Sequence, residues 1–491
     1  MASTAVAPAA SVPTSRAAPG KKAASAKPVS SKLAQADPNT RYSSRQPRPY
    51  NVDEIHQFKV PNLTIKDLLS AIPAHCFERS TLRSFLSLSI DLIKVSALAY
   101  AGTYIDPLLK SVDFTSSPLN SFISPATQFS LARFAAWAFW SFWQGLVFTG
   151  IWVVAHECGH QAFSPSKTIN NAVGWVLHSA LMVPYHSWRI SHARHHAGTG
   201  HLTRDEVFVP RTRAQRGLKN LRPLATDEDE DVKAAEQVAG KVIRQDNETW
   251  GEWFHELLED APLYSLIYIV VQQTLGWPLY LLKNSSGQLH YPKGTNHFNP
   301  DAIIFDARHR NQIIVSDIGI ALSVFALAAW GLTSPGGFGE VFRFYVVPYL
   351  WCNNWLVMIT YLQHTDPLLP HYKAEAWTFP RGALCTIDRT WLGPIGAWFL
   401  HGISETHVAH HISSKIPHYN AWEATDALKE RLGEHYVCSK ENILISLWKS
   451  IRTCRFVDEN DEIAFYRTID GVPHAVVAPD SSNNSDSGVG M

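Results

Sequence analysis

The hydrophobic residues of this chain gather in a few long runs that are separated by polar stretches. Residues 134–155 contain no charged side chain and are long enough to cross a bilayer core of about 30 Å. Residues 85–105 form a similar run that carries two charged residues. Residues 313–332 and 341–362 complete a set of four predicted membrane spans.

A fifth apolar run, residues 263–283, has basic segments on both sides. Gly276 and Pro278 interrupt it, and a proline inside a helix costs about 3 kcal/mol. We predict an in-plane or re-entrant helix here, with a true membrane span as the alternative. With four spans, the distribution of Lys and Arg places segments 156–262 and 285–312, and both termini, on the cytosolic side.

Composition sets the limits of the folded part. Residues 1–60 are rich in Ala, Ser, Pro and Lys, and residues 466–491 end in a similar polar stretch, so we predict a disordered tail at each end of a membrane domain at 61–465. The predicted fold is an all-α integral membrane protein with four transmembrane helices, in-plane or re-entrant helices and a cytosolic helical cap. The balance of 43 basic and 43 acidic residues gives no indication of nucleic-acid binding. Six cysteines without CxxC spacing are typical of a reducing compartment.

Histidine is the residue type that indicates chemistry. The motifs HECGH, HARHH and HVAHH begin at residues 156, 192 and 407. Together they contain His156, His160, His192, His195, His196, His407, His410 and His411. On a helix, positions i, i+3 and i+4 lie within an arc of about 100°, so we expect each HxxHH motif to present three imidazoles on one face. The composition predicts HxxHH about 0.05 times by chance, and it occurs twice.

Such a concentration of imidazoles predicts a metal site. Imidazole binds Zn, Cu, Fe and Ni, so ligand type alone leaves the metal open. One tetrahedral zinc uses three or four protein ligands, whereas eight or more imidazoles fit two metals. Iron is the metal that combines such an arrangement with O₂ chemistry.

Two other functions fit part of the pattern. HECGH matches the H-E-x-x-H motif of zinc metalloproteases, with Glu157 as the general base. A protease has no use for the six further histidines, which counts against it. A metal-storage or transport protein is the non-enzymatic alternative, but transport sites usually lie at mid-bilayer, and these motifs lie outside the predicted spans.

The three histidine motifs, in this order among four spans, resemble those of the membrane fatty acyl desaturases. The phrases that tighten the resemblance to Δ12, or oleate, desaturases, and to fungal members among them, are "HECGHQAFS", "SWRISHARHH", "GHLTRDEVFVPRTR", "LGWPLYLL", "HFNPDAIIF", "TYLQHTDPLLPHY" and "THVAHHISSKIPHYNAWEAT". They extend from about residue 145 to 425. The resemblance implies an oxidoreductase that uses O₂ and two electrons to place a cis double bond in an acyl chain.

The resemblance also implies roles for individual residues. The eight motif histidines would be ligands of two iron ions, and His364 in "YLQHT" would be a ninth. His178 and His401 lack the motif spacing and are expected to be structural or to support the ligands. Glu157 would orient a ligand imidazole or be a solvated acid. Cys158 would be a small packing residue.

Partners follow from the same resemblance. No GxGxxG or HPGG motif is present, so electrons are expected from separate cytochrome b5 and its NADH-dependent reductase at the endoplasmic reticulum membrane. The basic run at 211–222 is either a docking patch for an acidic partner or a segment held near anionic lipid headgroups. The substrate would be an oleoyl chain carried on phosphatidylcholine or coenzyme A. An ω3 or bifunctional Δ12/ω3 desaturase is the nearest alternative, and hydroxylases and acetylenases share the scaffold.

Overall fold

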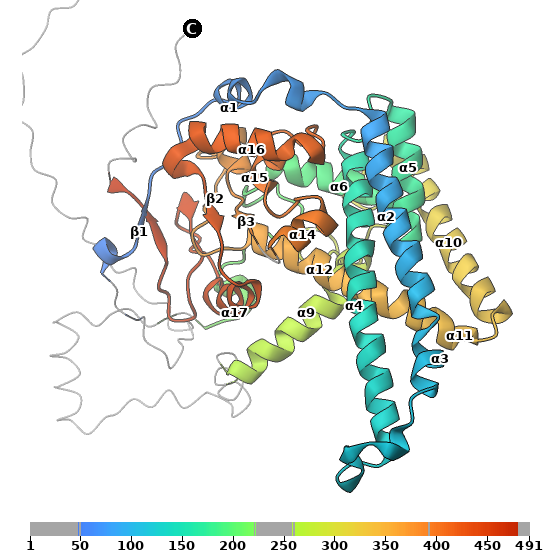
Figure 1. Ribbon diagram of the computed structural model, residues 1–491. Coiled ribbons are helices and arrows are strands. Elements are labelled where there is room, and N and C mark those ends of the chain that lie inside the picture. Colours follow the sequence, from blue (N-terminus) through green and yellow to red (C-terminus); the bar gives the residue numbers. More distant parts are fainter. Residues whose placement is uncertain are drawn as a thin grey trace, which may run out of the picture. The chain divides into compact units, whose positions relative to one another are not determined.

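In the computed structural model, helices dominate the part of the chain that the structure describes (Figure 1). The described residues are 48, 51–219, 221, 258, 261–390 and 393–479. Most of the predicted N-terminal tail and the last part of the predicted C-terminal tail lie outside them.

The helices and strands have the following bounds. The helices are α1 (Ile65–Ala71), α2 (Thr81–Gly102), α3 (Ile105–Lys110), α4 (Pro125–Gly159), α5 (Lys167–Ala180), α6 (Tyr185–Gly198), α9 (Pro262–Lys283), α10 (Arg310–Thr333), α11 (Gly337–Val341), α12 (Val347–His364), α13 (Phe379–Ala383), α14 (Gly393–Leu400), α15 (His407–Ile412), α16 (His418–Leu432) and α17 (Ile443–Thr453). A π-helical turn, Phe342–Val346, joins α11 to α12. The strands are β1 (His56–Phe58), β2 (His371–Tyr372), β3 (Asp388–Arg389), β4 (Cys438–Ser439), β5 (Ile463–Ala464) and β6 (Ala475–Val477).

Helix α4 is the longest helix in the described part of the chain, and it contacts α2, α5, α12 and α14. Its 35 residues rise about 52 Å, which exceeds the thickness of a bilayer core. Ser124 caps the helix by accepting a hydrogen bond from the Thr127 backbone N–H, and Pro125 fills the first position, where its missing N–H removes no helical bond. The second half of α4 is almost entirely buried. The HECGH motif at its C-terminal end therefore lies in the interior.

Several helices present large apolar side chains outward. Ile93 in α2 is 67% exposed, Ile267 in α9 is 54% exposed and Phe325 in α10 is 72% exposed. Side chains of this kind repeat along these three helices. Extended exposed apolar surface marks a contact with lipid or another apolar partner, so these faces fit a bilayer environment.

Among the described residues, four helical segments are long and apolar enough to cross a membrane. They are Thr81–Lys110, Pro125–Gly159, Pro262–Lys283 and Ala307–Thr333. Three of them contain the predicted spans at 85–105, 134–155 and 313–332. The fourth is α9, for which the sequence predicted an in-plane or re-entrant helix, and that assignment is not confirmed. Helix α9 runs unbroken through Pro278, so the predicted interruption was wrong. The helix is held instead by Trp277, Tyr280 and Leu281, which are buried in the core cluster that also contains Leu356 of α12.

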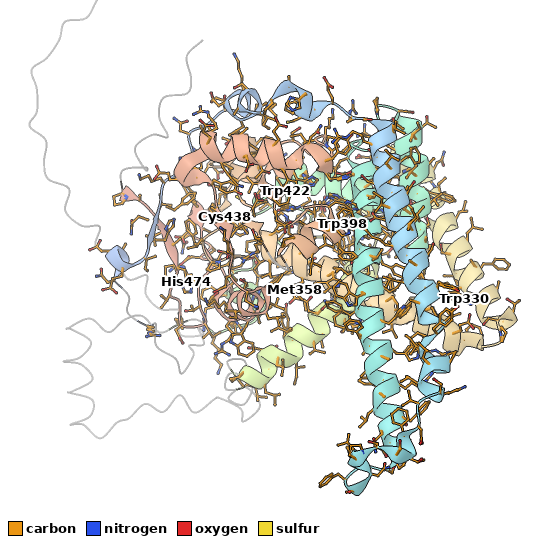
Figure 2. The ribbon with its side chains drawn as sticks, in the orientation of Figure 1. Trp330, Met358, Trp398, Trp422, Cys438 and His474 are labelled. Carbon is orange, nitrogen blue, oxygen red and sulfur yellow. The ribbon has the colours of Figure 1, made fainter. Side chains whose placement is uncertain are left out.

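The predicted span at 341–362 is helical but is not among the four candidates. Its polar content explains this, because the segment contains Arg343, Asn353 and Asn354, and Asn353 is buried inside the protein. The segment follows a turn near Trp330, which lies at the end of α10 (Figure 2). The Trp330 indole N–H donates to the Glu340 carboxylate (2.9 Å) and so links α10 to α11. Helix α12 then packs against both α4 and α9.

The remaining elements form a mixed cap, so the described residues are mostly helical rather than all-α. Strand pairs are short: β1 with β6 and β3 with β4 are parallel, and β2 with β5 is antiparallel. The registers place His371 opposite Ala464 and Asp388 opposite Cys438. Helices α1, α13, α15 and α16 share an apolar core around Leu68, Val408 and Leu428.

Both predicted tails extend too far into the folded part. Residues 56–58 form β1, which pairs with β6 at 475–477, so the prediction of disorder up to residue 60 and from residue 466 was wrong at these strands. The Phe58 and Phe465 rings meet edge to face with centroids 5.3 Å apart. Neither strand is long or alternating enough to be recognised alone, and each is stabilised by its partner from the other end of the chain.

The C-terminal pairing gives a testable prediction. Deleting residues 466–491 removes the buried side chains of Tyr466, Ile469 and Ala475 together with β6. Each large buried side chain contributes about 1.5–3 kcal/mol. We expect the shortened protein to aggregate in size-exclusion chromatography of detergent extracts. Deleting only 480–491 leaves all these contacts in place and serves as the control; equal behaviour of the two deletions would contradict the structure.

Candidate metal centre

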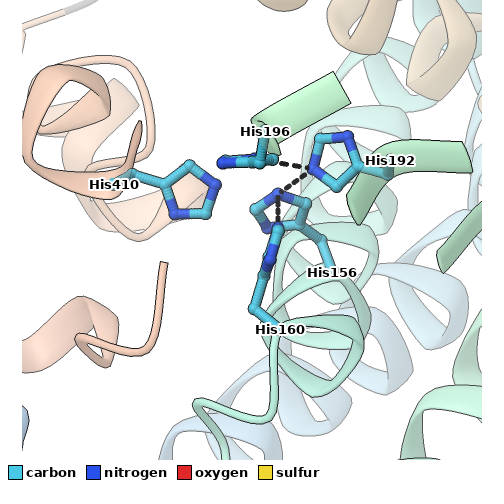
Figure 3. Close-up of side chains that lie close together, drawn as sticks. All are labelled: His156, His160, His192, His196 and His410. Atoms are coloured by element: carbon cyan, nitrogen blue, oxygen red, sulfur yellow. Dashed lines mark hydrogen bonds between the residues drawn. The ribbon is translucent and has the colours of Figure 1, made fainter. Parts of the chain in front are cut away.

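Five histidines from three helices form a first cluster. His156 and His160 come from the C-terminal end of α4, His192 and His196 from α6, and His410 from α15 (Figure 3). One nitrogen of each lies within 4.8 Å of those of the others. The His156 Nε2 atom is 3.0 Å from that of His192 and 3.2 Å from that of His160. The His192 and His196 Nε2 atoms are also 3.2 Å apart.

A second cluster lies beside the first. His195, His364 and His411 have nitrogens within 4.8 Å of one another. The His364 Nε2 atom is 3.3 Å from that of His195 and 3.0 Å from that of His407, which joins the cluster. His364 ends α12 and comes from no histidine motif. All nine histidines singled out from the sequence are therefore brought together.

The HxxHH spacing distributes imidazoles between the two clusters. In α6, His192 and His196 reach the first cluster and His195 the second. In α15, His410 reaches the first, and His407 and His411 reach the second. Each HxxHH motif thus supplies imidazoles to both clusters, a division that the expected one-sided arrangement did not specify. Positions i+3 and i+4 diverge by about 100°, which lets one helical turn serve two neighbouring sites.

The spacing between these nitrogens fits shared metal ions. Two ring nitrogens at about 2.1 Å from one metal and at a right angle lie about 3 Å apart. The contacts of 3.0–3.3 Å match this value. Hydrogen bonding alone cannot satisfy them well, because His192 Nε2 lies near two other Nε2 atoms and an imidazole nitrogen carries either one proton or one lone pair.

Burial favours the uncharged form, which binds metals, for several of these imidazoles. It lowers the pKa of His410 to about 4. Burial, together with neighbouring histidines, also holds the pKa values of His192, His196, His407 and His411 well below the usual value. The Nε2 atoms of His410 and His411 are buried and have no hydrogen-bond partner among the described residues. Lone pairs of this kind are available to a metal ion.

Two polar residues fix the tautomers of the second cluster. The Asp205 carboxylate accepts from Nδ1 of His195 (2.6 Å), which leaves the lone pair on Nε2. The backbone N–H of Gly200 holds the same carboxylate. The Thr199 hydroxyl donates to the His195 carbonyl and lies 3.2 Å from Nδ1 of His411, so it accepts from that nitrogen. The lone pair of His411 is thereby also placed on Nε2.

Aromatic rings hold the planes of other imidazoles. Trp188 stacks on His192 with centroids 4.4 Å apart, and Phe208 stacks on His364 at 5.6 Å. These two aromatics, with Asp205 and Thr199, were missed in the sequence. Only their positions in the sequence could have indicated these roles: Trp188 lies four residues before His192, and Thr199 follows the same motif closely.

An apolar cavity reaches both clusters. Its volume is ≈ 340 Å³, and it lies between α4, α9 and α12. The histidines on its wall are His156, His192, His195, His364 and His407. Most of the remaining lining is apolar, including Val153, Trp277 and Leu356. The imidazoles therefore face a space suited to a hydrocarbon rather than to a peptide.

Comparisons with known proteins agree with this geometry. The family model described as fatty acid desaturase matches residues 132–227 and 225–438. The chain belongs to the fatty acid desaturase family. A "Delta(12) fatty acid desaturase" of Mortierella alpina is 45% identical over 84% of this chain and 92% of its own length. A "Delta(12)-fatty-acid desaturase" of Arabidopsis thaliana is 38% identical over 89% of this chain and 94% of its own length. An "Oleate hydroxylase" of Claviceps purpurea is 39% identical over 84% of this chain and 82% of its own length.

Glu157 has a different role from those the sequence predicted. In this desaturase it is buried, and its carboxylate accepts from the backbone N–H of His418 (2.6 Å) and pairs with the His418 ring at Nδ1 (2.8 Å). Burial alone would lower the pKa of His418, but the Glu157 carboxylate overrides this and raises it. Glu157 thus neither orients a ligand imidazole nor is solvated. It points away from His156 because successive helical residues diverge by about 100°.

His178, His401 and Cys158, which the sequence analysis also considered, lie outside the two clusters. His401 bonds the Asp91 carboxylate of α2 (2.6 Å). His178 is buried between Trp152 and Trp188, and burial lowers its pKa to about 3. Neither belongs to a cluster, and their structural or supporting roles stay predictions. Cys158 is fully buried in the apolar core, which confirms its packing role.

The Glu157–His418 pair gives a prediction about stability. Removing one partner of a buried ion pair costs about 3–5 kcal/mol. We expect Glu157→Gln to lower the thermal unfolding midpoint of the purified protein while metal content stays near wild type, because Glu157 touches no clustered imidazole. The double variant with His418→Ala should be no less stable than the worse single variant, as coupled residues are not additive.

The matched control is Glu423→Gln. Glu423 pairs with His75 at 2.9 Å, but both side chains are 56% exposed. An exposed pair contributes about 0–1 kcal/mol. Equal destabilisation by Glu157→Gln and Glu423→Gln would contradict the buried pair.

Proposed function

We propose that this protein is an acyl-lipid desaturase that introduces a cis double bond at Δ12 of oleoyl chains and so makes linoleoyl chains. The observation that carries the proposal is the pair of imidazole clusters on the wall of an apolar cavity. The relatives named Δ12 desaturases supply the position of the double bond. In the reaction, O₂, two electrons and two protons combine with two hydrogens of the chain to give the double bond and two waters.

Two iron ions are the proposed cofactors. His156, His160, His192, His196 and His410 would hold one ion, and His195, His364, His407 and His411 the other. When bound, the two ions would supply the oxidising power that, with O₂, removes hydrogen from unactivated methylene groups. Support comes from the nitrogen spacing, the neutral imidazoles and the tautomers set by Asp205 and Thr199.

The chain's own residues position the substrate. Trp277, Leu356 and Val153 line the cavity where the methylenes of the acyl chain would lie, and their burial excludes water from the reacting carbons. Trp188 and Phe208 hold two of the facing imidazoles by stacking. These residues therefore bind and orient the acyl chain.

Location and electron supply complete the proposal. Relatives from Brassica juncea and Glycine max are named endoplasmic reticulum omega-6 desaturases, at 39% and 38% identity. We place this protein in the endoplasmic reticulum membrane, with both clusters and both termini on the cytosolic side. Its electrons would come from cytochrome b5 and its NADH-dependent reductase. The acyl carrier would be phosphatidylcholine or coenzyme A.

Oleate hydroxylation is a second candidate, favoured by the Claviceps purpurea relative. Both reactions start at an unactivated methylene group of the same chain. They differ in whether a second hydrogen or an oxygen atom is transferred. The product therefore separates them.

Metal content tests the two-cluster assignment. We expect His195→Ala and His410→Ala, one for each cluster, to lower the iron content below two per chain. Each substitution removes one of the ligands that would hold an ion, so the remaining ligands bind that ion less tightly. Iron is measured by mass spectrometry on purified protein. His290→Ala is the control, since His290 is exposed and lies outside both clusters. Two irons per chain in both cluster variants would remove the proposed centre.

Product analysis tests the activity. In yeast that makes oleate but no dienes, expression should produce linoleate, detected by gas chromatography–mass spectrometry with the double bond mapped. His410→Ala, expressed at the same level, should produce none. A hydroxylated oleate would favour the second candidate, and a diene at another position would correct the regiochemistry. No new fatty acid from the wild-type protein would reject the proposal.

A further inference from the structure

A second cavity adjoins the first. Its volume is ≈ 450 Å³. The residues that line both cavities are Phe208, Tyr268, Gln272, Ser285 and Ser286. The two spaces therefore meet at one junction, beside the Phe208 ring that stacks on His364. Whatever extends from the metal centre through this junction enters the second cavity.

The lining of the second cavity differs in character from that of the first. Arg211, Arg216 and Arg455 lie on its wall, and no Asp or Glu is among its described lining residues. Arg211 is half-buried and Arg216 is exposed, and neither forms an ion pair within the part of the chain that the structure describes. Burial and the nearby Arg216 lower the pKa of Arg211. Two like charges held together without a carboxylate are stabilised by an anion.

The junction itself is polar. Gln272, Ser285 and Ser286 lie between the apolar cavity and the arginines, and the Gln272 Oε1 atom is buried with no hydrogen-bond partner among the described residues. Hydroxyl and amide groups at this point match the ester or thioester that joins an acyl chain to its carrier. The order along the two cavities is therefore apolar, polar and then cationic, which is also the order of groups along an activated acyl lipid.

We propose that the second cavity binds a phosphate group of the acyl carrier through Arg211 and Arg216, while the acyl chain passes the Phe208 junction into the first cavity. This inference rests on the proposed function. Guanidinium groups bind phosphate oxygens through paired, charge-assisted hydrogen bonds. The phosphate belongs either to a phospholipid headgroup or to coenzyme A, and both present this chemistry. The basic run noted in the sequence thus contributes two residues to a substrate site instead of a partner-docking patch.

The test uses the full-length protein in yeast microsomes with NADH, and oleoyl-phosphatidylcholine or oleoyl-coenzyme A as substrate. For the Arg211→Ala/Arg216→Ala variant, we expect KM for the acyl substrate to rise about tenfold, with kcat within about twofold of wild type, because the arginines bind a part of the substrate that does not react. Iron content should be unchanged. The KM of the Arg211→Lys/Arg216→Lys variant should lie between those of the wild type and the double Ala variant, because Lys keeps the charge but loses the paired hydrogen-bond geometry.

The matched control is Arg308→Ala. Arg308 is 78% exposed, lies outside both cavities and should leave KM unchanged. Glycerophosphocholine and coenzyme A serve as competing probes. The one that inhibits the wild type, and inhibits the double Ala variant at least about tenfold less strongly, identifies the source of the phosphate.

Three results would overturn the inference. The first is an unchanged KM with unchanged inhibition in the double Ala variant. The second is a rise in KM for cytochrome b5 alone, which would assign the arginines to partner docking. The third is a fall in kcat with loss of iron that the Lys variant does not repair, which would make their role structural.

The inference and the proposed function fail in different ways. If the wild type makes linoleate and the double Ala variant has normal KM, only the phosphate site is rejected. If the wild type makes no linoleate, binding of glycerophosphocholine or coenzyme A to the purified protein still tests the site. If the wild type binds one of these compounds and the double Ala variant does not, the phosphate site is supported while the proposed reaction is rejected. If both proteins bind it equally, or neither binds it, the phosphate site is rejected.

Discussion

Nine imidazoles packed in the protein interior impose the constraint on which the rest of the site depends. Protonated rings with nitrogens 3.0–3.3 Å apart would repel one another, and burial lowers the pKa values of rings such as His192, His364 and His411, which favours their neutral forms. Neutral buried nitrogens without a partner, such as those of His410 and His411, each cost about 1–3 kcal/mol. The proposed metal ions would remove both costs. Their affinity for the site and the stability of the surrounding helices would therefore be linked.

The helices that carry the imidazoles are held by contacts on their other faces. The Glu157–His418 pair joins α4 to α16, and the His401 bond to Asp91 connects α2 with the segment before α15. Helices α9 and α12 complete the apolar cavity beside the clusters, and α9 extends from it to the arginine-lined cavity. The same helix packing thus positions the proposed metals, the acyl chain and the carrier phosphate relative to one another.

Apolar run length identified three of the four candidate spans, because helices that face lipid, such as α10, are themselves apolar along most of their length. The same criterion also selected 341–362, which is not among the candidates. The run 263–283 was set apart because of Pro278 and its basic flanks rather than its length, and the in-plane or re-entrant assignment is not confirmed. Pro278 lies inside a helix that is stabilised by packing, and α12 buries Asn353 and Gln363 within the protein. The strand formed by residues 475–477 was missed because its partner, β1, lies more than four hundred residues earlier. Neither segment is long or alternating enough for a strand to be predicted from its own residues.

The sequence by itself determined the chemistry: three histidine motifs at helical spacing already specify several imidazoles on each of three helices, since that spacing is a local property. His364 was reached only through family resemblance, because a single histidine at a helix end carries no pattern. Tertiary structure alone decided which imidazole joins which cluster, that Asp205 supports His195, and that Glu157 serves His418. Those outcomes depend on the angles at which α4, α6, α12 and α15 meet, and long-range packing sets these angles.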